Sequence, residues 1–426
     1  MVLFADQKGG MTMIKTVLGS ALIALSISGI AHAQIGNGQT GSATEINSDD
    51  GAGSVQYILP QATTATVQDL STAEPRMPML LDSQFESPAI RRAKQQRTQG
   101  APVSGIPGYV GMPEVESNAV GSTGDMPYSF QKVATYGQIG PSNFFYQVPV
   151  TSRPHRFTGK LYMRFGSSWF VCTASLIKRG VLATAAHCVH NYGQGASGFA
   201  DEVRWYPANY SPQGGPWGFY TGLTVYVPTP YVNGTDTCTT TGVICNNDIA
   251  TVVLTVRGKH AGDGLGGWYN YGWNGYGFVN SNLFGETVNE ITQLGYPVAW
   301  DNGYHMLRNN SFGVYDVQTG TNGQQMKNTL LGSPMTGGSS GGPWLVNFGT
   351  APWLTNSSAA TTGTSADRNI IVGTTSWGYV STTINIQGAS WFGQNYEYPA
   401  ADYGGRGAGN IGSLMRDTCN AYPSYC

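Results

Sequence analysis

The segment Gly337-Gly338-Ser339-Ser340-Gly341-Gly342-Pro343-Trp344 places serine inside a run of glycines, directly before the apolar stretch 344–348. Glycine adopts backbone dihedral angles that side chains forbid, so the chain here can turn sharply and direct several N–H groups toward one point. A serine at such a turn can serve as a nucleophile beside an anion-binding pocket. A surface turn is the simpler interpretation, because Gly and Ser are the commonest turn residues. The other motifs of the chain decide between the two.

Composition indicates a globular, weakly charged protein. Charged residues make up 11% of the chain, against about 25% in average soluble proteins, while apolar residues still reach 40% and can form a core. A length of 426 residues is sufficient for two or three ordinary domains. The formal net charge of −2 supplies no basic field, so no nucleic-acid partner is expected. The scarcity of lysine and arginine leaves few cleavage points for basic-specific proteases, which suits a molecule outside the cell.

The N-terminal residues have the features of an export signal. Lys15 precedes an apolar run, and Ala31-His32-Ala33 has the small-x-small form of a signal-peptidase site. We therefore predict a signal peptide over residues 1–33, with translation starting at Met11 or Met13, and a secreted or periplasmic protein. The apolar run is too short for a membrane-spanning helix, so no membrane anchor is expected after signal removal. A buried apolar helix is the alternative interpretation.

Residues 34–135 differ in composition from the rest of the chain. They are rich in Ser, Thr, Gln, Gly and Pro, poor in aromatic residues, and lack long periodic apolar patterns. We therefore predict a mostly disordered region that serves as a pro-region, with a plain linker or a cell-surface tether as the alternative. One helix-compatible stretch, 80–99, ends in a basic cluster that we interpret as a solvated helix face; a role in processing is the alternative.

From residue 136 onward the pattern is that of a β protein. Short apolar runs, bounded by Gly, Ser or basic residues, recur at 159–166, 169–177, 180–185, 203–206, 223–227, 249–256, 291–299, 313–317, 344–348 and 369–375. Many short strands separated by turn signals favour barrels or sandwiches over alternating βαβ units. The Gly-, Tyr-, Trp- and Asn-rich stretch 262–282 is expected to be one long loop, and 410–419 a short helix.

The six cysteines fall into three close pairs: Cys172 with Cys188, Cys238 with Cys245, and Cys419 with Cys426. An even number in an exported chain indicates disulfides, although six cysteines permit fifteen connectivities. Zinc is the alternative, but no C-x-x-C occurs and the spacings match no closed zinc site. We therefore predict three local disulfides, Cys172–Cys188, Cys238–Cys245 and Cys419–Cys426, and no metal.

Two further residues are candidates for chemistry together with Ser340. His187 ends the stretch Ala183-Thr184-Ala185-Ala186-His187 beside Cys188, and Asp248 begins an apolar strand. Taken separately, His187 is more often a structural histidine and Asp248 a strand-start cap. Taken together, the order His, Asp, Ser matches one known way of building an acyl-transfer triad.

These motifs together resemble the trypsin/chymotrypsin-like serine proteases, and within them the bacterial branch that includes the glutamyl endopeptidases. The resemblance begins near residue 157 and covers roughly 250 residues; it does not extend before about residue 136. The motifs that carry it are, in family order, Cys172-Thr173-Ala174-Ser175, Thr184-Ala185-Ala186-His187-Cys188, Asp248-Ile249-Ala250, Gly295-Tyr296-Pro297, Gly338-Ser339-Ser340-Gly341-Gly342-Pro343 and Ser376-Trp377-Gly378.

The resemblance implies an all-β protease domain over residues 136–426, preceded by the signal peptide and a largely irregular pro-region. Two six-stranded antiparallel barrels are expected at about 145–260 and about 283–409, with the active site between them and a short C-terminal helix. Such enzymes act on proteins or peptides, need no metal or organic cofactor, and a monomer is expected.

The resemblance also assigns roles to individual residues. Ser340 would be the nucleophile, His187 the general base, and Asp248 the carboxylate that orients the imidazole. The N–H groups of Gly338 and Ser340 would form the oxyanion hole. The remaining expected substrate-binding residues line the pocket or pair with the substrate main chain; they are Pro334, Met335, Thr375, Ser376, Trp377 and Gly378.

Two departures from the family pattern affect activation and specificity. The residue before the nucleophile is Ser339, so the ion pair that activates digestive-type enzymes is not expected. Pro334 stands where a basic-residue cutter needs a carboxylate, while Met335 and Thr375 stand where glutamyl endopeptidases use a hydroxyl residue and a histidine. We therefore expect an uncharged, mainly apolar residue before the scissile bond, unless a partner such as His305 enters from elsewhere.

The sequence predicts a secreted serine endopeptidase. Two alternatives come from other functional classes. The first is a catalytically silent homologue that binds proteins through the same cleft, and the second is an exported adhesive protein, which the Gly-, Tyr- and Asn-rich composition favours.

Overall fold

The computed structural model describes the following residues: 31–34, 40–46, 53–65, 67–81, 128–133, 138–139, 146–147, 149–273, 275–281, 285–350, 365, 367–380, 384–393 and 410–426. The predicted signal peptide up to residue 30 and most of the helix-compatible stretch 80–99 lie outside these residues. Leu80, at the start of that stretch, lies in a strand instead.

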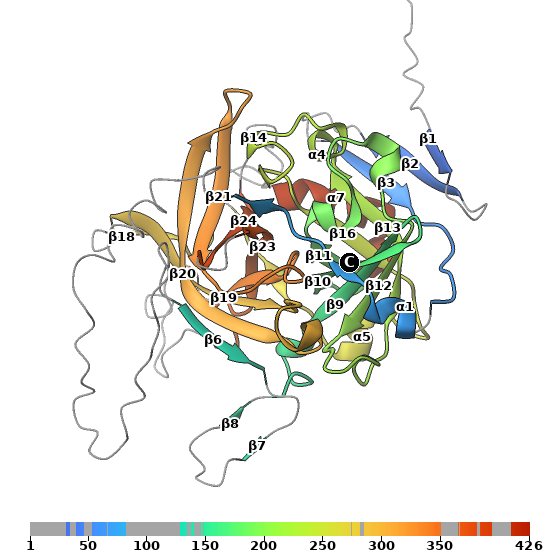
Figure 1. The fold of residues 1–426 in the computed structure, drawn as a ribbon, viewed down its shortest axis with the longest axis horizontal. Helices are drawn as coiled ribbons and strands as arrows, with labels where there is room; N and C mark the ends of the chain where they lie inside the picture. The colour runs from blue at the N-terminus through green and yellow to red at the C-terminus, as the bar shows by residue number, and fades with distance from the viewer. Residues whose placement is uncertain are drawn as a thin grey trace, which may run out of the picture.

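Six strands close into the first barrel (Figure 1). They are β9 (Thr158–Phe165), β10 (Ser168–Lys178), β11 (Val181–Thr184), β16 (Ala250–Leu254), β13 (Tyr220–Pro228) and β12 (Glu202–Pro207). Each pairs antiparallel with the next in that order, and β12 pairs back with β9, so this ring has no free edge. All six agree with predicted apolar runs.

A second ring closes in the same way. Its strands are β19 (Glu286–Gly295), β20 (Leu307–Thr319), β21 (Gln325–Gly332), β24 (Ile386–Trp391), β23 (Ile370–Tyr379) and β22 (Pro343–Val346). All the pairings around the ring are antiparallel, ending with β22 on β19. The predicted fold of two six-stranded antiparallel barrels is therefore confirmed, although β21 and β24 were absent from the predicted runs.

The two barrels lie side by side in Figure 1, the first mainly green and the second yellow to orange. Strand β16 is buried along its whole length, because β11 and β13 flank it and the C-terminal helix α7 (Asn410–Ala421) packs on it. Thr251 Oγ1 and Thr418 Oγ1 lie 2.8 Å apart in that contact. The predicted helix 410–419 is confirmed, and it returns from the second barrel to cover the first.

The last three residues of the predicted signal peptide and part of the segment expected to be irregular are paired with the first barrel. Strands β1 (Ala31–Gln34), β2 (Thr40–Ile46) and β3 (Ser54–Ile58) extend its sheet, with β3 antiparallel to β13. Tyr57 is buried and stacks on Phe199 with 4.5 Å between ring centroids. These strands are stabilised by tertiary pairing, which the polar composition of the segment did not indicate.

Further along this segment, a short extended piece crosses between the barrels. After helix α1 (Val67–Ser71), strand β4 (Glu74–Pro75) pairs parallel with β10 of the first barrel. Strand β5 (Met79–Leu80) pairs parallel with β23 of the second. In Figure 1 this blue stretch runs across the middle of the molecule.

The stretch 262–282, expected to be one long loop, contains regular structure among its described residues. Helix α5 (Ala261–Leu265) begins it, β17 (Asn270–Tyr271) pairs with β23, and β18 (Val279–Ser281) pairs with β19. The loop prediction was therefore wrong in part, because pairing partners far away in sequence override the glycine-rich composition. The remaining short elements are β6 (Tyr128–Lys132), β7 (Gln138–Ile139), β8 (Tyr146–Gln147), α3 (Ala186–Val189), α4 (Thr229–Asn233), β14 (Cys238–Thr240) and β15 (Ile244–Cys245).

All three predicted disulfides are confirmed: Cys172–Cys188, Cys238–Cys245 and Cys419–Cys426. The first joins β10 to α3, the second joins β14 to β15, and the third ties α7 to the C-terminal residue. Across the described ranges, helices long and apolar enough to span a membrane are absent.

Candidate active site

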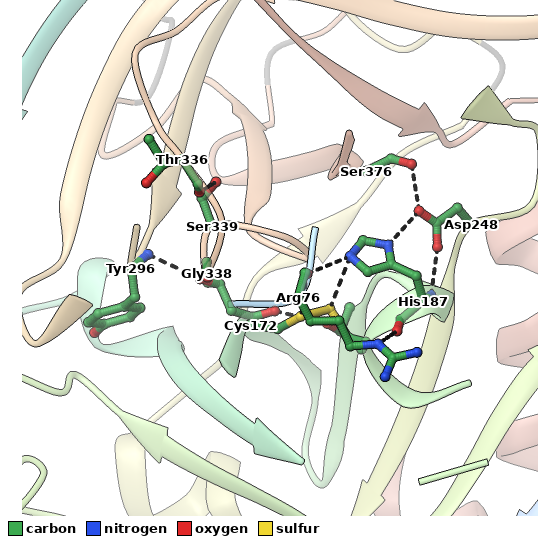
Figure 2. The surroundings of a disulfide bond; sticks show 12 residues. Arg76, Cys172, His187, Asp248, Tyr296, Thr336, Gly338, Ser339 and Ser376 are labelled. Carbon is green, nitrogen blue, oxygen red and sulfur yellow. Dashed lines mark hydrogen bonds and ion pairs between the residues drawn. A yellow bond between two sulfur atoms is a disulfide. The ribbon is translucent and has the colours of Figure 1, made fainter. Parts of the chain in front are cut away.

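His187 and Asp248 form a buried pair at the end of the first barrel. His187 lies in the short helix α3, which follows β11, and Asp248 lies just before β16. Asp248 Oδ2 lies 2.8 Å from His187 Nδ1, and Asp248 Oδ1 accepts the main-chain N–H of His187 at 2.8 Å (Figure 2). Only 4% of His187 and 1% of Asp248 are exposed. The carboxylate therefore orients both the imidazole ring and the main chain that carries it.

Ser376 connects this pair to the second barrel. It lies in β23, and its Oγ donates a hydrogen bond of 2.5 Å to Asp248 Oδ2 (Figure 2). Ser376, expected as a substrate-binding residue, is thus a direct partner of Asp248. Asp248 is therefore hydrogen-bonded to residues of both barrels. Because Asp248 also orients His187, the position of the histidine depends on the contact between the two barrels.

Ser340 lies in the glycine-rich loop between β21 and β22, and this loop is bound tightly to the first barrel. Thr173 on β10 donates its N–H to the Ser340 carbonyl at 2.7 Å. Gly341 has φ +74°, and a Cβ at this position would lie 2.1 Å from Thr184 Oγ1 and 2.4 Å from the Thr173 carbonyl oxygen. The close approach and the left-handed backbone both require glycine at position 341.

Ser340 is buried and is not hydrogen-bonded to the His187–Asp248 pair. Within the described part of the chain, Ser340 Oγ has no hydrogen-bond partner. The Nε2 atom of His187 instead lies 3.0 Å from the carbonyl oxygen of Arg76 (Figure 2). The main-chain N–H groups of Gly338 and Ser340 have no acceptor among the described residues. The structure therefore joins His187 to Asp248, and it shows no described residue bound to the Ser340 hydroxyl or to these two N–H groups.

A cavity of about 260 Å³ opens next to the glycine-rich loop. Pro334, Met335 and Gly378, which were expected to bind the substrate side chain, line it. Thr375 and Trp377 are not among the lining residues, since both side chains are fully buried. The described residues that line the cavity include no Asp, Glu, Lys, Arg or His, and His305 is therefore not among them.

The base of the cavity is a neutral hydrogen-bonded network that the sequence did not predict. Gln387 on β24 donates from Nε2 to the Met335 carbonyl at 2.7 Å, and Gln293 donates to Gln387 Oε1 at 2.6 Å. Ser333 Oγ donates to Gln293 Oε1 at 2.8 Å, and Gln293 Nε2 also donates to Thr375 Oγ1 at 2.9 Å. Gln387 was missed because the strand β24 itself was not recognised. Where the glutamyl endopeptidases use a histidine, this chain therefore has a buried threonine within an amide network.

Arg76 is the second residue of the site that sequence reasoning missed. Its guanidinium donates to the His187 carbonyl oxygen and to Asn191 Oδ1, and it lies 4.0 Å from the centroid of the Phe165 ring. Burial lowers the pKa of Arg76 to about 10, so the side chain is still charged at neutral pH. Arg76 stands in a segment with no local motif, and nothing in the sequence indicated a contact with His187.

Two closed six-stranded antiparallel barrels with a buried His–Asp pair at their junction fit the trypsin-like serine-protease fold. No family model matches the chain, and no curated protein matches it. Among solved structures it is similar to a thermostable serine protease, AL20, from an extremophilic microorganism, with 22% identity and a TM-score of 0.40, covering 56% of this chain and 92% of that one. It is also similar to the protease Anisep from Arthrobacter nicotinovorans, with 22% identity and a TM-score of 0.41 over 56% and 91% of the two chains. A Glu endopeptidase is similar with 17% identity and a TM-score of 0.39, over 69% and 96%.

Proposed function

We propose that this chain is a secreted serine endopeptidase that hydrolyses peptide bonds of protein or peptide substrates through a Ser340–His187–Asp248 triad. The observation that carries the proposal is the buried His187–Asp248 pair, with both carboxylate oxygens engaged by His187, beside the glycine-rich loop of Ser340. The three disulfides support a location outside the cytosol.

The chemistry assigned to these residues proceeds in two steps. Ser340 Oγ forms a bond to the substrate carbonyl carbon while His187 Nε2 takes the hydroxyl proton, and that proton then passes to the leaving amine as the peptide bond breaks. Water repeats the sequence on the acyl-enzyme and releases the acid. The unpaired N–H groups of Gly338 and Ser340 are suited to stabilise the negative charge on the carbonyl oxygen in both steps.

The proposed substrate preference is an uncharged, mainly apolar residue before the scissile bond. The cavity beside the Ser340 loop is lined by described residues that carry no charge, with Met335 and Pro334 in its wall and the Gln387 amide at its base. A buried charged side chain would lack a partner there, which costs several kcal/mol, about 2 or more.

A catalytically silent homologue that binds proteins is the second candidate function. Two observations favour it: Ser340 Oγ has no hydrogen-bond partner within the described residues, and His187 Nε2 faces the Arg76 carbonyl instead of the serine. In this case the cleft would bind peptides without cleaving them.

Covalent labelling of the full chain with a fluorophosphonate, followed by peptide mapping, separates the two functions. An endopeptidase is labelled on Ser340, and labelling is lost in the Ser340→Ala and His187→Ala variants. Circular dichroism of each variant checks that it is folded. Absence of label on Ser340 after prolonged incubation, both in the natural chain and in variants that open the cleft, contradicts the endopeptidase.

A further inference from the structure

We propose that residues 74–80 act as a built-in inhibitor that binds along the cleft in a non-productive orientation. This proposal rests on the proposed endopeptidase function, because only a competent cleft needs to be blocked. It assigns to the cleft a mode of peptide binding distinct from that of a substrate.

The segment occupies the main-chain edges of both barrels. Arg76 donates its N–H to the Val171 carbonyl on β10 at 3.2 Å. On the other barrel, Gly378 donates to the Pro78 carbonyl at 3.2 Å and Val380 to the Leu80 carbonyl at 2.8 Å. A substrate that pairs with the Ser376–Gly378 edge needs the same donor of Gly378, so the two peptides cannot be bound together.

The peptide group nearest to His187 is presented in an orientation that does not allow cleavage. The Arg76 carbonyl oxygen lies 3.0 Å from His187 Nε2, the atom that must accept the proton of Ser340. For a carbonyl to react, its oxygen has to face the oxyanion donors instead. Moreover, His187 Nδ1 faces the Asp248 carboxylate, so both ring nitrogens point at acceptors.

The Arg76 side chain holds this carbonyl in place. Its guanidinium donates to the main-chain oxygen of His187 and to Asn191 Oδ1, so it binds the very helix that carries the histidine. The planar group also lies over the Phe165 ring, with 4.0 Å between Cζ and the ring centroid. A single arginine therefore places its own carbonyl against His187 and fixes the helix beneath it.

Met77, the next residue, reaches the cavity proposed for the substrate side chain. Met77 lines this cavity, and its Sδ lies 3.7 Å from Gln387 Nε2 at the base. A Cβ on Gly378 would lie 3.3 Å from the same sulfur, so the glycine leaves just enough room for it. An uncharged, flexible side chain in an uncharged cavity is a compatible occupant.

The preceding residues keep the segment close to the cleft. Thr63 is bound to Glu202 on β12 by its N–H at 3.0 Å and its Oγ1 at 2.6 Å. Strand β3 is paired with β13. Residues 74–80 are therefore attached to the first barrel ahead of the cleft, and a tethered ligand has an effective concentration in about the millimolar range.

Two measurements on the full chain test this inhibitor. The first is the rate of fluorophosphonate labelling of Ser340 in the natural chain, in Arg76→Ala and in the control Arg179→Ala, whose exposed side chain pairs with Asp263 away from the cleft. We expect Arg76→Ala to be labelled at least about tenfold faster, which corresponds to about 1.4 kcal/mol, and Arg179→Ala to match the natural chain. A synthetic peptide of residues 72–81, added to the Arg76→Ala chain, should slow the labelling of Ser340 again. The same peptide with alanine at position 76 should leave the labelling rate unchanged.

The second measurement does not depend on catalysis. In the inactive Ser340→Ala chain, the amides of Gly378 and Val380 should be protected from hydrogen exchange, and adding Arg76→Ala should speed their exchange at least about tenfold. Equal exchange rates in the two chains would contradict the proposal that Arg76 holds residues 74–80 in the cleft. If Arg76→Ala speeds hydrogen exchange but leaves the rate of Ser340 labelling unchanged, the segment is bound but is not an inhibitor, and the proposed endopeptidase function is unaffected. Altered exchange with no labelling in any variant contradicts the endopeptidase and the inhibitor, and leaves only a peptide-binding cleft.

Discussion

At the scale of single residues, the site is a set of side chains whose positions depend on bonds across the two barrels. Asp248 accepts from His187 on the first barrel and from Ser376 on the second. The motifs around these residues predicted their proximity, because the order and local sequence of each were informative. No local motif indicated Arg76 or Gln387, because their contacts join segments that are far apart in the chain.

Ser376→Ala should slow the reaction without removing it. The 2.5 Å hydrogen bond to Asp248 is made to a charged group, so its loss should lower kcat by about tenfold or more, with KM little changed. The comparison is made in the Arg76→Ala chain, where the cleft is open, using hydrolysis of a neutral peptide. Ser376→Thr keeps the hydroxyl and should recover most of the rate. An equal loss in the alanine and threonine variants would show that the hydroxyl does not position Asp248.

Gly341→Ala should destabilise the folded chain strongly. The new Cβ would overlap Thr184 Oγ1 and the Thr173 carbonyl oxygen, and φ is +74°. Gly349 is a matched control, since its φ is +70° with no atom within 4 Å of a Cβ. Gly349→Ala should cost about 1 to 2 kcal/mol from the backbone alone, and Gly341→Ala several kcal/mol, about 3 or more. Thermal unfolding of the two variants provides the measurement, and equal melting temperatures would contradict the packing argument.

At the scale of elements, ten predicted runs correspond to strands of the two barrels, because each is an apolar stretch bounded by turn residues. The two strands that were missed are β21 and β24. Gln325–Gly332 begins with polar residues, and Ile386–Trp391 contains Gln, Gly, Ala and Ser, so neither has the usual composition of a strand. Both form strands because they pair with other strands and close the second ring. Such pairing depends on distant parts of the chain and cannot be recognised in a short stretch of sequence.

One of the missed strands contributes a neutral side chain to the cavity beside the glycine-rich loop. Gln387 of β24 closes the base, and no charged residue is among the described lining. Profiling of the Arg76→Ala chain against a mixed peptide library should therefore give dominant cleavage after uncharged, mainly apolar residues, methionine among them. Dominant cleavage after Glu, Lys or Arg would contradict the neutral cavity.

At the scale of the whole molecule, the first barrel is covered by two segments from opposite ends of the chain. Strand β3 precedes the second barrel in the sequence and helix α7 follows it, and both pack on the first barrel. Ser54 of β3 donates to Asp417 of α7 at 2.7 Å, in a buried contact that joins residues 363 positions apart. The N-terminal strand and the C-terminal helix thus support one another as well as the barrel beneath them. This contact could not be predicted from the sequence, because no local motif in either segment indicates that the two pack together.

Asp417→Ala should therefore loosen both segments at once. Removing the carboxylate leaves the buried Ser54 hydroxyl without this partner, at a cost of about 1 to 3 kcal/mol. Hydrogen exchange should increase in β3 as well as in α7. An increase confined to α7 would show that the strand is held independently of the helix.

The return of α7 to the first barrel also has a consequence for the order of events during biosynthesis. The helix covers β13 and β16, and the Tyr425 carbonyl accepts the N–H of Gly180 at the start of β11. The ribosome makes these residues only after the whole second barrel, so the first barrel lacks part of its outer layer until the second barrel has been synthesised. A nascent chain of this kind therefore cannot complete its first barrel while the second barrel is still being made.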